Sequence, residues 1–261
     1  MHRFFLPADW IQGNTVTVTG PQAHQIARVL RMQPGDVITV LDNSGWEIET
    51  QLVQVERDAV RGEVLRRRLV TSEPRTKISL YQGVLRSRSF ELVLQKGTEV
   101  GVVEFVPVIA ERCVISDLDA VEKKRRRWEW IVQEAAEQCR RGRLPALRPA
   151  VLLPQICEQV RQRGGLNLIL WEGNRQRPRP ADQRVTLRDL LRTPPPGSRA
   201  TWPPLTISLF VGPEGGFTQA EVNLAQRYDL VPVTLGPRIL RAETAGLIAA
   251  VAILYELGDL E

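Results

Sequence analysis

The chain has 261 residues, 43% of them hydrophobic, and a formal net charge of +5 at pH 7. This length and apolar content provide a core for one large domain or two modest ones. Few side chains can bind a metal or assist a nucleophile as a histidine does. The chain has only two histidines, both near the N-terminus, and no two of its three cysteines form a C-x-x-C pair. These residues are His2, His24, Cys113, Cys139 and Cys157. We therefore expect no metal site and no disulfide framework.

Residues 1–72 contain short β-type runs that are separated by turn residues, with one helix expected at 21–32. Apolar residues alternate with polar ones in several of these runs, as in strands with one buried face. The pattern predicts a small N-terminal β-barrel. A linker-like stretch at 70–76 follows it, and we assign residues 73–261 to a second domain.

In the second domain, β-type runs alternate with helical segments. Strands are expected at 78–84, 105–109, 166–171, 205–211 and 230–234, and helices at 90–100, 120–139, 155–163, 218–228 and 242–257. Such alternation predicts an α/β fold, with a mostly parallel sheet covered by helices on both faces. The Pro- and Arg-rich span 175–204, with a short helix at 186–191, is expected to be a surface insertion.

The expected last helix, 242–257, is apolar on nearly every face, which predicts burial all round. Its partner is either the core of one chain or a second subunit, and we favour a dimer. The apolar stretch at 245–255 is too short to span a bilayer, and no leader-like segment opens the chain. A cytoplasmic protein without a membrane segment is therefore expected.

Two glycine-marked loops follow the last two expected strands. Residues 212–216 read Gly-Pro-Glu-Gly-Gly, and residues 235–244 read Leu-Gly-Pro-Arg-Ile-Leu-Arg-Ala-Glu-Thr. Glycine permits positive φ and a close approach of the backbone to a ligand. At neighbouring strand ends, two such loops would form a cleft lined by main-chain donors and acceptors, where open α/β sheets bind nucleotides. We therefore expect a cofactor that contains a nucleoside.

A basic run also bears on function. Residues 122–148 include nine basic and four acidic residues, an excess equal to the net charge of the chain. Such a run is either a solvated helix face or a surface for phosphates, which arginine binds bidentately. Beside a nucleotide cleft, we favour contact with RNA. The chain has neither G-x-G nor G-K-[ST], which argues against a dinucleotide oxidoreductase and a P-loop phosphotransferase.

The paired loops resemble the C-terminal signature of the RsmE family of 16S ribosomal RNA uridine N3-methyltransferases, which belong to the SPOUT superfamily. Four further segments are similar to the family, at residues 2–5, 95–101, 107–113 and 134–139. The segment 85–90, Leu-Arg-Ser-Arg-Ser-Phe, departs from the Lys-Gly pair common in the family. The resemblance covers nearly the whole chain.

The resemblance implies a PUA-like RNA-binding barrel at 1–72, followed by a SPOUT methyltransferase domain at 73–261 with a C-terminal trefoil knot. It also implies S-adenosyl-L-methionine as cofactor, N3 of a uridine in 16S rRNA of the small ribosomal subunit as acceptor, and a homodimer. From the residues alone, a non-catalytic RNA-binding or ribosome-assembly protein, another RNA position and a ribose 2′-hydroxyl acceptor all stay open.

Candidate catalytic residues follow the second loop. Arg241 could place positive charge beside uracil O2 or O4, and Glu243 could accept the N3 proton or cap the last helix. Glu172 could contact the cofactor ribose or amino group, or be a solvated loop carboxylate. The full set of expected cofactor residues is Glu172, Gly212, Pro213, Glu214, Gly215, Gly216, Leu235, Gly236, Ile239, Leu240, Arg241 and Thr244. The residues expected to bind RNA are Arg3, Arg28, Arg31, Arg125, Arg126, Arg140 and Arg141.

Overall fold

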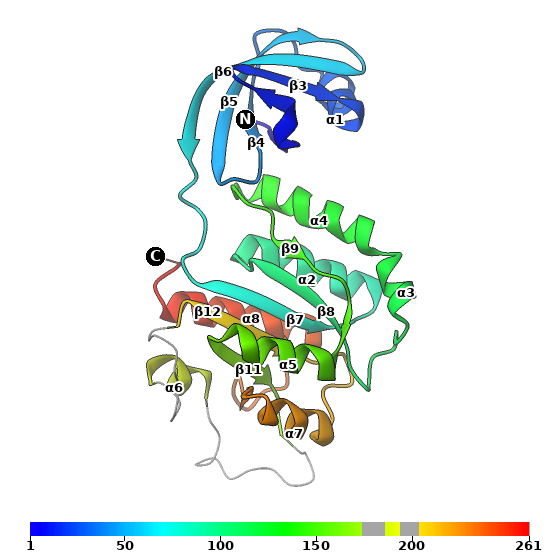
Figure 1. Cartoon of the computed structure of the whole chain (residues 1–261), viewed down its shortest axis with the longest axis vertical. Coiled ribbons are helices and arrows are strands. Elements are labelled where there is room, and N and C mark those ends of the chain that lie inside the picture. Colours follow the sequence, from blue (N-terminus) through cyan, green and yellow to red (C-terminus); the bar gives the residue numbers. More distant parts are fainter. Residues whose placement is uncertain (174–185, 194–203, 261) are drawn as a thin grey trace. The chain divides into compact units, whose positions relative to one another are not determined.

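The structure is a computed structural model that describes residues 1–173, 186–193 and 204–260 (Figure 1). Its internal contacts divide the chain into two compact units. The first unit comprises residues 1–73 together with residues 133–144, and the second comprises residues 74–132 and 145–261. The division expected from the sequence, 1–72 and 73–261, does not include the segment 133–144 in the first unit.

The first unit is built on a six-stranded sheet with the order β1-β4-β5-β6-β3-β2. β1 is parallel to β4 and the other pairs are antiparallel. The long β5–β6 pair contains register shifts. Such shifts bend and twist a sheet, and the sheet of this unit is strongly curled. The strands are β1 (Arg3–Phe5), β2 (Ile11–Gln12), β3 (Thr15–Thr19), β4 (Val37–Leu41), β5 (Trp46–Val55) and β6 (Ala59–Leu69), with a 3-10 turn at Ala8–Trp10.

The expected barrel is thus a curled, open sheet. Its path ends at β1 and β2, which do not pair with each other in the described part of the chain. These end strands have three and two residues, which leaves few main-chain groups for closure. Side chains on the inner face, among them Phe4, Val40 and Ile48, form the core of this unit with Ala23 and Ile26.

The helix expected at 21–32 is interrupted. The structure has a short helix α1 (Gly20–His24), followed by a π-helical turn, η2 (Gln25–Val29). Arg31 has a left-handed φ of 54°, which ends the helical path before it. Arg28 and Arg31, which both lie within the helix expected at 21–32, therefore do not share a helix face.

Residues 133–144 complete the first unit. Ala136 is buried with Phe5 and Leu41, and the backbone N–H of Phe5 donates to Oε1 of Glu137 at 3.0 Å. Burial raises the pKa of Glu137. This segment therefore contributes apolar and polar contacts to the unit.

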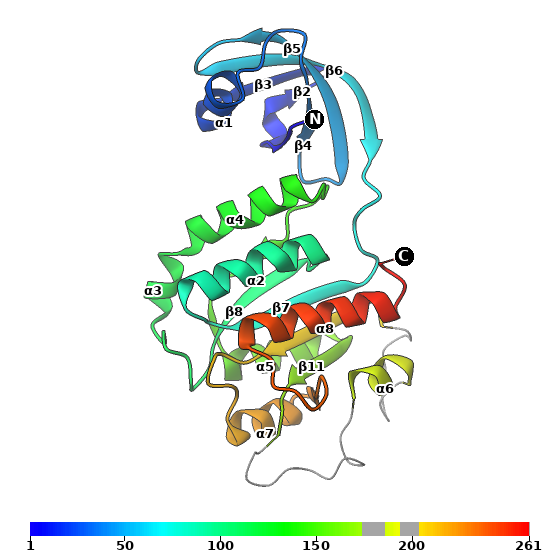
Figure 2. The ribbon, with the colours of Figure 1, turned by 180° about the vertical axis from the view of Figure 1, so that it is seen from behind.

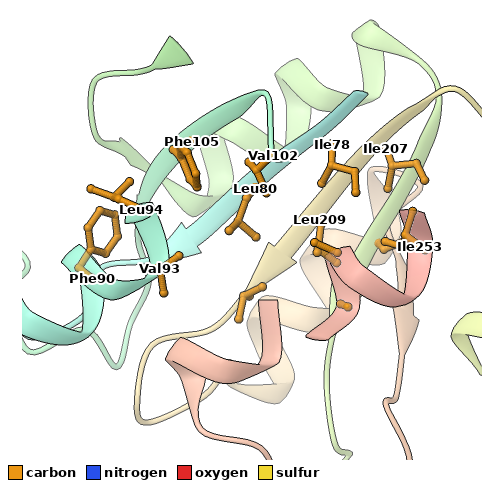
Figure 3. Packing of buried hydrophobic residues seen from close by; sticks show 14 of the residues in the cluster. Ile78, Leu80, Phe90, Val93, Leu94, Val102, Phe105, Ile207, Leu209 and Ile253 are labelled. Carbon is orange, nitrogen blue, oxygen red and sulfur yellow. The ribbon is translucent and has the colours of Figure 1, made fainter. Parts of the chain in front are cut away.

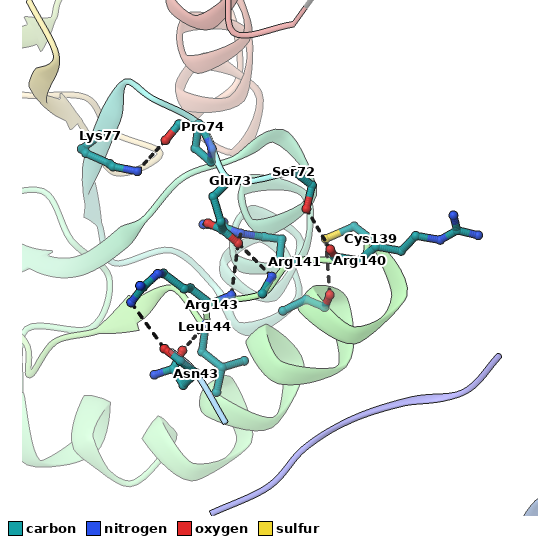
Figure 4. A network of polar contacts seen from close by, with 12 residues as sticks. Asn43, Ser72, Glu73, Pro74, Lys77, Cys139, Arg140, Arg141, Arg143 and Leu144 are labelled. Carbon is teal, nitrogen blue, oxygen red and sulfur yellow. Dashed lines mark hydrogen bonds and ion pairs between the residues drawn. The ribbon is translucent and has the colours of Figure 1, made fainter. Parts of the chain in front are cut away.

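Glu73 is the centre of a second set of contacts to that segment (Figure 4). Its carboxylate accepts from Nη2 of Arg141 at 2.9 Å and from the backbone N–H groups of Gly142 and Arg143 at 3.0 and 3.1 Å. Burial on its own raises the pKa of Glu73, but the hydrogen bonds and charge of Arg141 outweigh it, so the pKa lies below its usual range. Asn43 binds the same segment through Leu144, whose N–H donates to its Oδ1 at 2.7 Å.

The second unit contains the parallel sheet that the alternating pattern predicted. Its order is β10-β8-β7-β12-β11-β13, with β9 also beside β8, and each described pair is parallel. The five expected strands correspond to β7 (Lys77–Gly83), β8 (Glu104–Ile109), β11 (Leu166–Leu170), β12 (Thr206–Val211) and β13 (Val231–Val233). Two short strands, β9 (Ala146–Leu147) and β10 (Val151–Leu152), were not predicted.

Helices cover both faces of this sheet (Figures 1 and 2). α2 and α8 pack in the apolar cluster on one face, and α5 and α7 in the cluster on the other. The helix expected at 120–139 is in fact two helices, with a break at residues 123–124. The helices are α2 (Ser87–Val100), α3 (Leu118–Glu122), α4 (Arg125–Gln138), α5 (Leu153–Arg163), α6 (Leu187–Arg192), α7 (Gln219–Arg227) and α8 (Ala242–Glu256).

Figure 3 shows the larger cluster, where side chains of α2 and α8 meet alternate residues of β7 and β12. The ring of Phe90 lies 4.3 Å, centroid to centroid, from that of Trp128. α8 comes close to the sheet at Gly246, where an added Cβ would lie 3.2 Å from side-chain atoms of both Leu80 and Val211. The absence of a side chain at this position permits the close packing.

The structure corrects the prediction that the last helix is buried on all sides. In α8, Ala249, Ala250, Ile253 and Leu254 are buried. Ile248, Val251 and Tyr255 are 47%, 38% and 66% exposed. Since these three are three and four residues apart, they form one apolar stripe on the surface of the chain. No helix of the described part of the chain is long and apolar enough to cross a membrane.

The short helix α6 differs from the surface insertion that was expected. Leu187, Leu190 and Leu191 belong to the same buried cluster as α8. An ion pair of 2.6 Å also joins Nε of Arg192 to Oε1 of Glu256. The parts of the expected insertion at 175–185 and 194–203 lie outside the described residues.

Candidate cofactor pocket and RNA-binding residues

A pocket of about 300 Å³ lies where β11, β12 and β13 end at the same edge of the sheet. The chain forms it from three segments, at 170–172, 211–217 and 233–245. Because parallel strands have their carboxyl ends at one edge, loops far apart in the sequence meet there. The cleft predicted from the two glycine-marked loops therefore exists, and the loop after β11 forms a third side.

Eleven of the twelve predicted cofactor residues line this pocket, the exception being Thr244. The catalytic candidate Arg241 also lines it, whereas Glu243 does not. Most of the lining residues that were missed neighbour predicted ones, so strand-end position could have identified them. They include Leu170, Trp171, Phe217, Arg238, Ala242 and Ala245.

The loop at 212–216 is shaped by close backbone contacts. Gly212 is buried, and the backbone N–H of Gly216 donates to the carbonyl of Pro213 at 2.8 Å to close a tight turn. Gly216 has a φ of 69°, which favours glycine. Beside this turn, an added Cβ at Gly83 on β7 would lie 2.5 Å from the backbone nitrogen of Pro213. β7 can thus lie against the loop because Gly83 has no side chain.

Polar contacts hold the same loop at three points. Nε2 of Gln82 donates to the carbonyl of Gly212 at 3.3 Å, and Nη1 of Arg112 donates to that of Gly215 at 2.9 Å. Oε1 of Glu214 accepts from the backbone N–H of Arg86 at 3.0 Å. The segment 85–90, which departs from the family pattern, is therefore attached to the pocket loop by the backbone N–H of Arg86 rather than by a side chain of its own.

The loop between β13 and α8 is more exposed. Gly236 has a φ of 109°, and its N–H donates to Oγ1 of Thr234 at 3.3 Å. Arg241 is the N-cap residue of α8 without a side-chain capping bond, and its exposed guanidinium has no ion pair among the described residues. Glu243 lies in the first turn of α8, where a negative charge is favourable for the helix dipole.

The predicted RNA-binding arginines fall into two groups. Arg3 is ion-paired with Glu47, and Arg141 with Glu73. Arg125 is ion-paired with both Glu122 and Glu129. Arg141 is also buried, with its side chain 4% exposed. The other four, which are exposed and have no ion pair within the described residues, are Arg28, Arg31, Arg126 and Arg140. The described residues contain no group of three or more His, Cys, Asp or Glu side chains placed to hold a metal ion.

Comparison with known proteins agrees with this architecture. The model of an RNA methyltransferase domain matches residues 71–254, and that of an RNA methyltransferase PUA domain matches residues 18–65. Ribosomal RNA small subunit methyltransferase E of Bacillus subtilis is 32% identical, with 98% of this chain and 97% of that protein covered. Its namesake in Synechocystis is 32% identical, with 97% and 77% covered.

Solved structures agree as well. The ribosomal RNA small subunit methyltransferase E from Neisseria gonorrhoeae, bound to S-adenosyl methionine, is 30% identical with a TM-score of 0.82, over 98% of this chain and 97% of that one. A Legionella pneumophila protein in complex with the bound cofactor SAM is also 30% identical with a TM-score of 0.82, over 97% and 96%. The chain belongs to the RNA methyltransferase family that includes the ribosomal RNA small subunit methyltransferases E.

Proposed function

We propose that the protein transfers a methyl group from S-adenosyl-L-methionine to N3 of a uridine in 16S rRNA of the small ribosomal subunit. The observation that carries the proposal is the pocket formed by three loops at the carboxyl ends of β11, β12 and β13. The relative from Neisseria gonorrhoeae, whose structure contains this cofactor, is 30% identical over nearly the whole chain. Its name, and those of the other relatives, support ribosomal RNA as the substrate.

The residues of the pocket fit such a cofactor. A volume of about 300 Å³ is at the lower end of the range for small-ligand sites. Main-chain groups at 212–216 and 235–240 can bind an adenosine moiety, since glycines leave the backbone accessible. Trp171, Ile239 and Leu240 add apolar surface, and Glu172 adds a carboxylate at the rim. The bound cofactor supplies an activated methyl group, so the protein has to orient the acceptor.

Arg241 is our candidate for stabilising the acceptor. Uridine N3 carries a proton, which passes to solvent water, and its loss leaves negative charge that spreads over uracil O2 and O4. A fixed positive charge beside those oxygens favours the anion, as an oxyanion hole does. Arg241 lines the pocket and has no competing ion pair in the described residues. For Glu243, which is outside the pocket lining, we favour stabilisation of the α8 N-terminus over proton transfer.

We assign contact with RNA phosphates to the exposed arginines Arg28, Arg31, Arg126 and Arg140, and a structural role to Arg125 and Arg141. The residues of the curled sheet, 1–72, serve as the RNA-binding domain and residues 73–261 as the methyltransferase domain. The match of an RNA methyltransferase PUA domain to residues 18–65 supports this assignment. We place the reaction in the cytoplasm, together with its ribosomal substrate, and cell fractionation tests that placement.

We also propose a C-terminal trefoil knot. α6, from the connection between β11 and β12, packs in the same cluster as α8, and a parallel bridge joins Thr186 to Thr234 next to β13. α8 itself packs against β7 and β12, in the middle of the sheet. The final helix therefore lies against the connection through which a knotted chain would pass. An experimental structure that traces residues 171–205 continuously around α8 tests the knot.

The function predicts methylation of a single nucleoside. We expect label from S-adenosylmethionine to enter small ribosomal subunits that lack the modification, with 3-methyluridine as the product in nucleoside mass spectrometry of the rRNA. Binding of the cofactor without any labelled 3-methyluridine would contradict the assignment. Label in a different nucleoside would leave a methyltransferase with another acceptor.

The role of Arg241 predicts a separation of rate from affinity. Arg241→Ala should lower the single-turnover rate of methyl transfer about 100-fold or more, because one charge-stabilising donor is lost. The dissociation constant of the cofactor, measured by calorimetry, should stay close to that of the wild type. Arg227→Ala, an exposed arginine in the last turn of α7, is the control. Weaker binding of the cofactor together with a normal rate at saturating cofactor would refute this role of Arg241.

The apolar stripe on α8 predicts a homodimer. Its residues Ile248, Val251 and Tyr255 are exposed in one chain, and burial against a second copy removes this apolar surface from water. Val251→Glu should convert the dimer to a monomer in sedimentation equilibrium, because a carboxylate would be buried in an apolar contact. Val53→Glu, at an exposed apolar position of the first unit, should stay dimeric. A monomeric wild type at micromolar concentration would rule the dimer out.

A further inference from the structure

A second cavity, of about 460 Å³, lies within the first unit. Arg3, Thr39, Glu47 and Arg68 contribute to it from four neighbouring strands, β1, β4, β5 and β6. They alternate along those strands with core residues such as Phe4 and Val40, so they lie on the opposite face of the curled sheet. The segment 69–72 and Arg140 complete the wall. We call this site the charged cavity.

Positive charge exceeds negative charge in the charged cavity. Glu47 is ion-paired with both Arg3, at 2.8 Å, and Arg68. A single carboxylate therefore faces two guanidinium groups. Arg140 adds a third positive charge, and it has no ion pair within the described residues. These four side chains together carry a net charge of +2, which favours an anionic ligand.

The cavity also has buried hydrogen-bonding groups that are not satisfied. The side chain of Arg3 is 10% exposed, and its Nε and Nη2 have no hydrogen-bond partner in the described residues. The same is true of Oγ1 of Thr39. Burial, with a further contribution from the charge of Arg140, lowers the pKa of Arg3. An unsatisfied buried donor is unfavourable, so a ligand that supplies acceptors to this region gains binding free energy.

We propose that the charged cavity binds a nucleotide through its phosphate, with Arg68 and Arg140 at the entrance and Arg3 and Thr39 at the base. Arginine forks match phosphate oxygens, and the volume is within the range of small-ligand sites. The inference rests on the proposed action on RNA, since the nucleotide is then a unit of the substrate strand. A free nucleotide carries the same phosphate chemistry.

Calorimetry with uridine 5′-monophosphate tests the site, using full-length protein saturated with S-adenosylhomocysteine to fill the cofactor pocket. We expect saturable binding of the monophosphate, and binding of uridine that is weaker by about tenfold or more, because charge-assisted bonds are lost. Competition by a short single-stranded RNA assigns the site to the substrate strand. Binding that such RNA does not displace assigns it to a free nucleotide.

Matched variants locate the binding. Arg140 has a φ of 65°, a conformation that asparagine accepts readily, so Arg140→Asn removes the charge with little strain. This substitution should weaken binding of the monophosphate about tenfold. Arg57→Asn, in an exposed turn outside the cavity, should have no effect on that binding. Thr39→Val should also weaken binding of the monophosphate without lowering the unfolding temperature, since the hydroxyl has no hydrogen-bond partner to lose among the described residues.

Two results would overturn the inference. One is the absence of saturable monophosphate binding, and the other is equal binding by wild type and both cavity variants. Binding of S-adenosylhomocysteine and methyl transfer to small subunits are measured on the same preparations. Normal methylation without nucleotide binding would refute only the nucleotide site in the charged cavity. Nucleotide binding without methylation would refute only the proposed reaction.

Discussion

The cofactor pocket depends on how closely strand β7 approaches the loop that follows β12. Gln82 is paired with Val211 in the sheet, and the next residue, Gly83, lies directly against Pro213. A side chain at Gly83 would occupy the space of the backbone of Gly212 and Pro213. The contact fixes where the 212–216 loop leaves the sheet, and therefore which main-chain groups face the pocket. Gln82 reinforces it through the carbonyl of Gly212.

The same principle operates at the last helix. Gly246 permits α8 to pack tightly on β7 and β12, and the N-terminus of α8 bears Arg241 at the pocket. The position of the candidate catalytic charge thus follows from backbone packing in the core. The helix has its buried residues on the sheet and its exposed stripe on the opposite side, so one element contributes to the pocket, the core and the proposed dimer contact.

The sequence predicted features that depend on local pattern, namely the parallel strands and the glycine-marked loops. It failed where distant residues decide the outcome. The ion pairs of Arg3 with Glu47 and of Arg141 with Glu73 join residues 44 and 68 positions apart, so a count of charges overstated the free basic surface. The left-handed Arg31 and the break before α4 also carried no clear local signal. The exposed stripe of α8 was hidden because its residues are as apolar as those that face the core.

The affinity of Gly83→Ala for S-adenosylmethionine measures whether the backbone contact at Gly83 shapes the cofactor pocket. Gly83 does not have a positive φ, so the effect of alanine is steric, through a Cβ placed 2.5 Å from the nitrogen of Pro213. We expect a folded protein whose affinity falls by about tenfold or more, equivalent to about 1.4 kcal/mol. Ser79→Ala, on the same strand, controls for general destabilisation. Unchanged affinity in a folded Gly83→Ala protein would show that this contact does not shape the pocket.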